Sequence, residues 1–173
     1  MKSRVMNMNK QKKAYIVFVL CIIAAAVLCF LLFYLPVFNP GYIFYHNNLL
    51  LRETDSYHSE KSVQMLFDKD SEKNFSFGKF SGVKTVKTMM PDENGRLFYS
   101  WDVHVERGHF KIVLIDIENQ RILETICDGS GNGNSEIHNL PHGEYCIKFV
   151  GDKATVSGKF SITESTAKCN GIL

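Results

Sequence analysis

The feature that most constrains this chain is an uncharged apolar run near its N-terminus. Residues 14–35 read AYIVFVLCIIAAAVLCFLLFYL and contain no Asp, Glu, Lys or Arg. As a helix rising 1.5 Å per residue, the run would be about 33 Å long, enough to cross the hydrocarbon core of a bilayer. A helix in a soluble core normally keeps a polar stripe, which this run lacks. We therefore predict a transmembrane helix over residues 14–35, in contact with the lipid bilayer.

A cleaved signal peptide is the main alternative to this anchor. The apolar core of such a peptide is usually about 7–15 residues long and ends at small residues. Here the run ends in the bulky FLLFYL, and its alanines at 24–26 lie in the middle. A lipoprotein signal is also disfavoured, because a leucine precedes both Cys21 and Cys29. We expect an uncleaved signal anchor.

The charges on either side of the run predict its orientation. Residues 1–13 carry five Lys and Arg and no acid, whereas the first basic residue after the run is Arg52. The positive-inside rule places this basic tail in the cytoplasm and the rest of a single-pass membrane protein outside. Fifteen of the 20 Lys and Arg and all 18 Asp and Glu follow the run, so the outer part has a net charge of −3. This charge gives no electrostatic basis for binding nucleic acid.

Residues 36–73 are expected to form a stalk or linker. Pro36 and the pair Pro40–Gly41 end the apolar helix, and the following RETDSYHSEKSVQMLFDKDSEKN is polar with weak periodicity. At the other end of the chain, residues 166–173 are expected to be a polar tail. One extracytoplasmic domain is expected between them, over residues 74–165.

This domain consists of short runs of alternating apolar residues, separated by turn signals. In RLFYSWDVHVE (96–106) nearly every second residue is apolar, which is typical of a strand with one buried face. Turns are expected at PDENG (91–95), at Arg107–Gly108 and at Gly151–Asp152. We predict an all-β fold, a single β-sandwich of jelly-roll or Ig-like type with about 7–8 antiparallel strands.

Three segments, FSFGKFSGVKTVK, GHFKIVLIDIENQRIL and HGEYCIKFVGDKATVSGKFSI, resemble small bacterial envelope proteins of uncharacterised function. In those proteins a membrane anchor or lipoprotein signal precedes one β-sandwich domain. The resemblance covers residues 74–164. The pattern of strands and turns in these segments is also similar to that of jelly-roll accessory and carbohydrate-binding domains of secreted bacterial enzymes. It implies the fold and an envelope location, and it carries over no catalytic residue.

The segment DGSGNGNSE (128–136) has part of the spacing of a calcium loop. An EF-type loop takes oxygen ligands from positions 1, 3, 5, 7 and 9, with glycine at position 6 and a closing glutamate at position 12. Gly133 fills the glycine position, but Asn139 stands where the glutamate belongs. We therefore expect no cofactor and a plain connection between strands here, with a calcium site as the alternative. The candidate metal ligands are Asp128, Ser130, Asn132, Asn134 and Glu136.

The run at 96–106 also offers a candidate ligand-binding face. Alternation places Tyr99 and Trp101 on the side expected to face the core. The opposite side carries Phe98, Asp102 and His104. An aromatic ring on an exposed sheet face can stack on a sugar ring, so these three residues are the candidate ligand contacts.

The cysteines and histidines leave alternatives open. Cys127 and Cys146 lie on expected strands. Either these two cysteines form a disulfide with each other, or they are free thiols like Cys169. The outer histidines either gather as a zinc or copper site or lie singly on the surface. They are His104, His109, His138 and His142.

No catalytic arrangement is recognisable in the sequence. GSGNG at 129–133 places a serine between glycines but lacks the strand–elbow–helix context of a hydrolase nucleophile. We expect no enzyme, but a membrane-anchored extracytoplasmic β-sandwich of non-catalytic binding type, with an envelope protein or a glycan as its partner. The alternative is an accessory or sensor module that binds a small ligand, glycan or calcium through its end loops.

Overall fold

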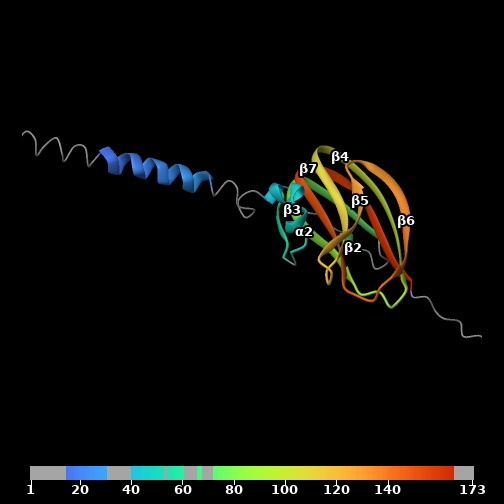
Figure 1. Ribbon diagram of the computed structural model, residues 1–173. Helices are drawn as coiled ribbons and strands as arrows, with labels where there is room; N and C mark the ends of the chain where they lie inside the picture. Colours follow the sequence, from blue (N-terminus) through green and yellow to red (C-terminus); the bar gives the residue numbers. More distant parts are fainter. Residues whose placement is uncertain (1–14, 31–39, 53, 61–65, 68–71, 166–173) are drawn as a thin grey trace, which may run out of the picture. The chain divides into compact units, whose positions relative to one another are not determined.

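A computed structural model describes residues 15–30, 40–52, 54–60, 66–67 and 72–165 (Figure 1). The chain divides into two compact units, Met1–Asn39 and Pro40–Leu173. In the first unit, residues 15–30 are helical, and the large apolar side chains of this helix are exposed. Within the described ranges, no helix meets the length and apolarity that a membrane span requires. Residue 14 and residues 31–35 lie outside those ranges, so the transmembrane helix stays a prediction.

The second unit is built on one antiparallel sheet. Its strand order is β1-β3-β7-β4-β5, with β2 also pairing with β3 and β6 also pairing with β4. Two short helical turns precede the sheet. The elements are η1 (Pro40–Tyr45), α2 (Asn47–Leu50), β1 (Ser56–His58), β2 (Leu66–Phe67), β3 (Glu72–Met89), β4 (Gly95–Asp116), β5 (Arg121–Asp128), β6 (Gly131–Leu140) and β7 (Tyr145–Ser165).

Three long strands give this sheet two layers. β3, β4 and β7 are 18, 22 and 21 residues long, several times the usual strand length of about 5–6 residues. Each strand bends near its middle, where the backbone has a positive φ at Lys79, Gly108 and Lys153 respectively. Register shifts in the ladders accompany the bends in β3 and β4. The sheet therefore curves over on itself, as the ribbon shows (Figure 1).

The main core lies between the two halves of the bent sheet. Phe75, in the first half of β3, has its ring centroid 5.6 Å from that of Phe110, in the second half of β4. The ring centroid of Phe149, on β7, lies 4.7 Å from that of Phe75. These rings are 0–3% exposed, and each contributes about 1.5–3 kcal/mol by leaving water. The prediction of an antiparallel all-β domain is confirmed, and one bent sheet supplies both layers.

Two of the expected turns are bends within continuous strands. Arg107–Gly108 lies inside β4 and Gly151–Asp152 lies inside β7. The expected loop at 128–136 is also different: β5 ends at Asp128, β6 starts at Gly131, and both pair antiparallel with β4. Only two residues separate β5 from β6. The two strands therefore act as one edge strand that bends together with β4 and pairs with both of its halves. The turn at PDENG is confirmed, with Gly95 N donating to Asp92 O over 2.8 Å.

Much of the segment expected to be a stalk belongs to the second unit. Tyr57 of β1 pairs with Gly82 of β3. Ile43, Phe44 and Leu50 of the helical turns are 0–9% exposed. They form a second apolar cluster on the outer face of the sheet. The buried strand residues of this cluster are Val83, Val113, Ile115, Cys146 and Val150.

Candidate functional site

The outer side of one half of the sheet forms a surface that we call the polar face. It carries the outward side chains of the first half of β4, of β6 and of the second half of β7. Phe98 pairs with Glu136 on β6 and with Thr163 on β7. The next outward residue of β4, Ser100, pairs with Asn134 and with Ser161 in the same way. A hollow of about 420 Å³ lies over this part of the face, and its outward lining residues are Phe98, Ser100, Asn134, Glu136, Ser161 and Thr163.

Strand alternation positions Phe98 in this hollow. Its neighbours Leu97 and Tyr99 point into the core and are 0% and 3% exposed, whereas Phe98 is 41% exposed. Ser100 Oγ and Ser161 Oγ share a hydrogen bond of 2.8 Å beside the ring. The hollow therefore combines one apolar ring with hydroxyl, amide and carboxylate groups. This composition suits a ligand that has both an apolar face and hydroxyl groups.

Asp102 and His104 lie further along the same face of β4. Both are exposed, and Asp102 pairs with Asn132 on β6 and with Lys159 on β7. His104 lines a separate hollow of about 230 Å³ at the bend of the sheet. The three predicted ligand residues therefore share one face, but only Phe98 lines the larger hollow.

The structure does not bring the five predicted metal ligands together at one point. Asn132, Asn134 and Glu136 share the polar face, where residues two apart along a strand are about 6.6 Å apart. Calcium ligands each lie about 2.3–2.6 Å from the ion, so an extended strand does not gather them around one point. Ser130 Oγ instead accepts a hydrogen bond of 2.8 Å from Val105 N. Asp128 pairs with Lys111 on β4.

No group of three or more His, Cys, Asp or Glu suited to a metal occurs among the described residues. This finding covers the four histidines as well as the segment 128–136. The conformation of that segment thus differs from the expected loop, because from Gly131 onward it pairs with β4. At Gly133 a β-carbon would meet the ring of Trp101 on β4. Calcium binding itself stays the untested alternative.

Glu136 has an incompletely satisfied carboxylate. Its Oε1 atom is buried and has no hydrogen-bond partner in the described part of the chain. His138 Nδ1 lies 3.2 Å from Oε1 and Arg96 lies 3.9 Å from it, so charge is near but no hydrogen bond is formed. A buried acceptor without a donor is costly.

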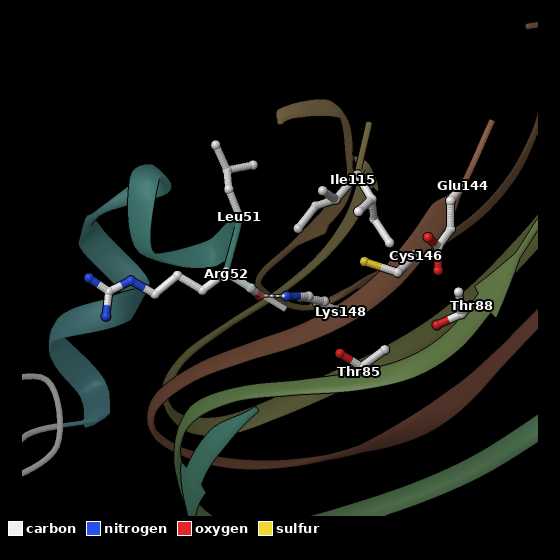
Figure 2. Close-up of a pocket in the computed structure, with 9 residues that line it drawn as sticks. Leu51, Arg52, Thr85, Thr88, Ile115, Glu144, Cys146 and Lys148 are labelled. Carbon is white, nitrogen blue, oxygen red and sulfur yellow. Dashed lines mark hydrogen bonds between the residues drawn. The ribbon is translucent and has the colours of Figure 1, made fainter. Parts of the chain in front are cut away.

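A second pocket, of about 240 Å³, lies on the outer face of the other half of the sheet (Figure 2). Lys148 of β7 lines it and is only 2% exposed. Its Nζ donates to the carbonyl oxygens of Leu50 and Arg52, in the segment that crosses the sheet. The sequence analysis did not identify this pocket. The one available signal was a lysine between Ile147 and Phe149, in an otherwise apolar strand.

Cys127 and Cys146 are free thiols, so the disulfide alternative is not realised. Cys127 belongs to the core between the layers, whereas Cys146 belongs to the cluster on the outer face. Two residues on opposite faces of a sheet cannot bring their sulfur atoms together. Burial raises the pKa of Cys127 to about 11, with a smaller contribution from the charge of Asp128. Cys169 lies outside the described residues.

No protein-family model matches the sequence, and no curated protein matches it. Among solved structures, TmCBM61 in complex with beta-1,4-galactotriose is 13% identical, with 66% of this chain and 89% of that chain covered and a TM-score of 0.37. The xylan-binding module CBM15 is 11% identical, with 64% and 89% covered and a TM-score of 0.31. The carbohydrate-binding module CBM28, specific for non-crystalline cellulose, is 12% identical, with 65% and 80% covered and a TM-score of 0.28. Likenesses at these TM-scores do not bear on what this chain binds.

Proposed function

We propose that the second unit is a non-catalytic binding module that holds a hydroxyl-rich ligand, such as a glycan, on the polar face. The observation that carries this proposal is the setting of Phe98. Its ring is 41% exposed in a hollow whose other outward groups are hydroxyls, an amide and a carboxylate. A sugar presents an apolar face that stacks on such a ring, and hydroxyls that bond the surrounding polar groups. Glu136 lines the hollow, and its carboxylate is an acceptor for one of them.

We also propose that residues 14–35 hold this module at the outer side of the cell membrane. The uncharged run, the exposed apolar side chains of helix 15–30 and the five basic residues before them support this location. The partner would then be a glycan or a glycosylated protein of the envelope.

The first prediction tests the polar face with Phe98→Ala. In isothermal titration of the full-length protein against neutral oligosaccharides, we expect this variant to bind the best ligand about tenfold more weakly, because the stacking surface is lost. Tyr57→Ala is the matched control, since Tyr57 is 42% exposed but lies on β1, away from the polar face. Equal affinity of Phe98→Ala and the unaltered protein would contradict the assignment, as would the failure of every oligosaccharide to bind.

A further inference from the structure

A second hollow lies on the same outer side of the sheet as the polar face, where the strands bend. Its volume is about 230 Å³, and residues of three neighbouring strands line it. His104 on β4 pairs with Ser157 on β7, and Ser157 pairs in turn with Ser76 on β3. These three residues form one row across the sheet, and all three are exposed. We call this row, together with Glu106 beside it, the bend hollow.

The side chains of the bend hollow can donate and accept hydrogen bonds. The hydroxyls of Ser76 and Ser157 do both, the imidazole of His104 does both when it is neutral, and the carboxylate of Glu106 accepts. Neither His104 nor Glu106 forms an ion pair with any residue in the described part of the chain. The bend hollow therefore presents to the solvent the polar groups that bind hydroxyls.

A continuous polar strip joins the bend hollow to the hollow beside Phe98. One row of outward residues lies between the two hollows: Asp102 on β4 pairs with Asn132 on β6 and with Lys159 on β7. All three are exposed. Phe98 and His104 are six residues apart on β4, which corresponds to about 20 Å between their Cα atoms. The two hollows are thus the ends of one strip that runs along β4.

The length of this strip determines which ligand can use both ends. One sugar ring is too small to reach from Phe98 to His104, whereas a chain of sugars laid along β4 contacts both. Phe98 is the only large apolar side chain exposed on the strip among the described residues, so stacking is confined to one end. Beyond it the strip offers hydrogen-bonding groups, which match the hydroxyls that a glycan carries along its whole length.

The charges on the strip favour a neutral chain. Lys159 lies opposite Asp102 on the neighbouring strand, and Arg96 Nη1 lies 3.9 Å from Glu136 Oε1. Each of these positive charges therefore has a carboxylate beside it, and Glu106 adds a further negative charge at the bend. A chain that carries a carboxylate on every sugar would find no surplus positive charge and would be repelled.

We propose that the bend hollow is the second subsite of the polar face, and that the ligand is a neutral glycan chain lying along β4. One sugar of the chain stacks on Phe98, and a later sugar bonds His104, Ser157 and Ser76. This inference rests on the proposed glycan-binding function. It adds the position of a second subsite, the path of the chain and its lack of charge.

The experiment is isothermal titration of the full-length protein in lipid nanodiscs with neutral oligosaccharides of glucose, galactose, mannose and xylose, each from the mono- to the hexasaccharide. In the series that binds best, the affinity should rise with chain length until the chain spans about 20 Å. We expect the hexasaccharide to bind at least about tenfold more tightly than the disaccharide.

The outcomes separate this inference from the proposed function. If no series binds, the glycan-binding function is wrong and the second subsite falls with it. If a series binds and Phe98→Ala weakens it, but the hexasaccharide binds no more tightly than the disaccharide, the function stands and the second subsite is overturned.

Two variants test the bend hollow directly. His104→Ala should weaken binding of the hexasaccharide about fivefold, and His104→Ala combined with Ser157→Val should weaken it further, because hydrogen bonds to the distant sugar are lost. Both should leave the affinity for the disaccharide unchanged, since that ligand stays near Phe98. His142→Ala, at an exposed turn residue outside both hollows, is the matched control. An equal loss for both ligands, or no loss for the hexasaccharide, would contradict the second subsite.

Hexagalacturonate tests the charge of the ligand, because it carries a carboxylate on each of its sugars. We expect it to bind at least about tenfold more weakly than the best neutral hexasaccharide. Equally tight binding of the two chains would show that the strip does not select a neutral ligand.

Discussion

Single residues decide where the long strands bend. Gly108 has a φ of +74°, and a β-carbon at this position would meet the backbone carbonyls of Asp152 and Lys153 on β7. A side chain is therefore excluded both by the conformation and by the close approach of the neighbouring strand. Gly131, at the start of β6, has a conventional φ and open space where a β-carbon would stand.

Gly108→Ala should consequently destabilise the protein, whereas Gly131→Ala should be nearly neutral. The strained φ alone costs about 1–3 kcal/mol in the free energy of unfolding, and the clash with β7 adds to it. Urea unfolding of the two variants and the unaltered protein measures the difference. If the two alanine variants had equal stability, the bend at Gly108 would not depend on its conformation.

At the same scale, alternation correctly assigned the sides of β4. Tyr99 and Trp101 face the core side, with ring centroids 6.0 Å apart, and Phe98 faces outward as expected. Tyr99 donates a hydrogen bond to Glu124 Oε2. Burial is the main cause that raises the pKa of Tyr99 to about 12, with this hydrogen bond as the next contribution.

At the scale of elements, Asp116 organises the connection between β4 and β5. Its carboxylate accepts hydrogen bonds of 3.1 Å from Asn119 N and of 3.1 Å from Arg121 Nε, and the residue is 1% exposed. Burial favours the neutral acid, but the hydrogen bonds from Asn119 and Arg121, together with the charge of Arg121, outweigh it. The pKa of Asp116 therefore lies below its ordinary value of 3.8.

A lowered pKa in the folded state makes Asp116 stabilising above its ordinary pKa. That contribution is lost as the pH falls below 3.8 and through the folded pKa. Asp116→Asn keeps the shape but loses the charge, and should cost about 1–3 kcal/mol at neutral pH. Urea unfolding at a series of acidic pH values should show the gap between the two proteins narrowing as the pH falls. A gap that stays constant would mean that the charge has no stabilising role.

The sequence could not distinguish a bend in a strand from a turn between two strands. Arg107–Gly108 and Gly151–Asp152 carry the residues that favour a reversal, yet both lie inside long strands. A positive φ serves a hairpin turn and a bulge equally well. Which of the two forms is decided by whether the flanking runs pair with each other or with other strands.

At the scale of the whole molecule, the N-terminal run should determine the location of the protein. We expect the full-length protein to sediment with membranes and to resist extraction by alkaline carbonate. Replacing Ile23 and Ala26 by arginine should move much of it to the soluble or degraded fraction, because two central arginines cost about 5 kcal/mol or more for insertion. Replacing the same two residues by leucine is the matched control. Membrane retention of the arginine variant would contradict the anchor.

The sequence by itself determined the apolar run, the antiparallel β character of residues 74–165 and the outward side of Phe98. These properties follow from local patterns, because a strand alternates its faces with period two and a bilayer demands an uninterrupted apolar helix. The tertiary structure alone decided the bends, the meeting of Phe98 with Glu136 and the burial of Lys148. Lys148 bonds Leu50, 98 residues away in the sequence, and no local pattern reveals which distant segment will cover an outward side chain.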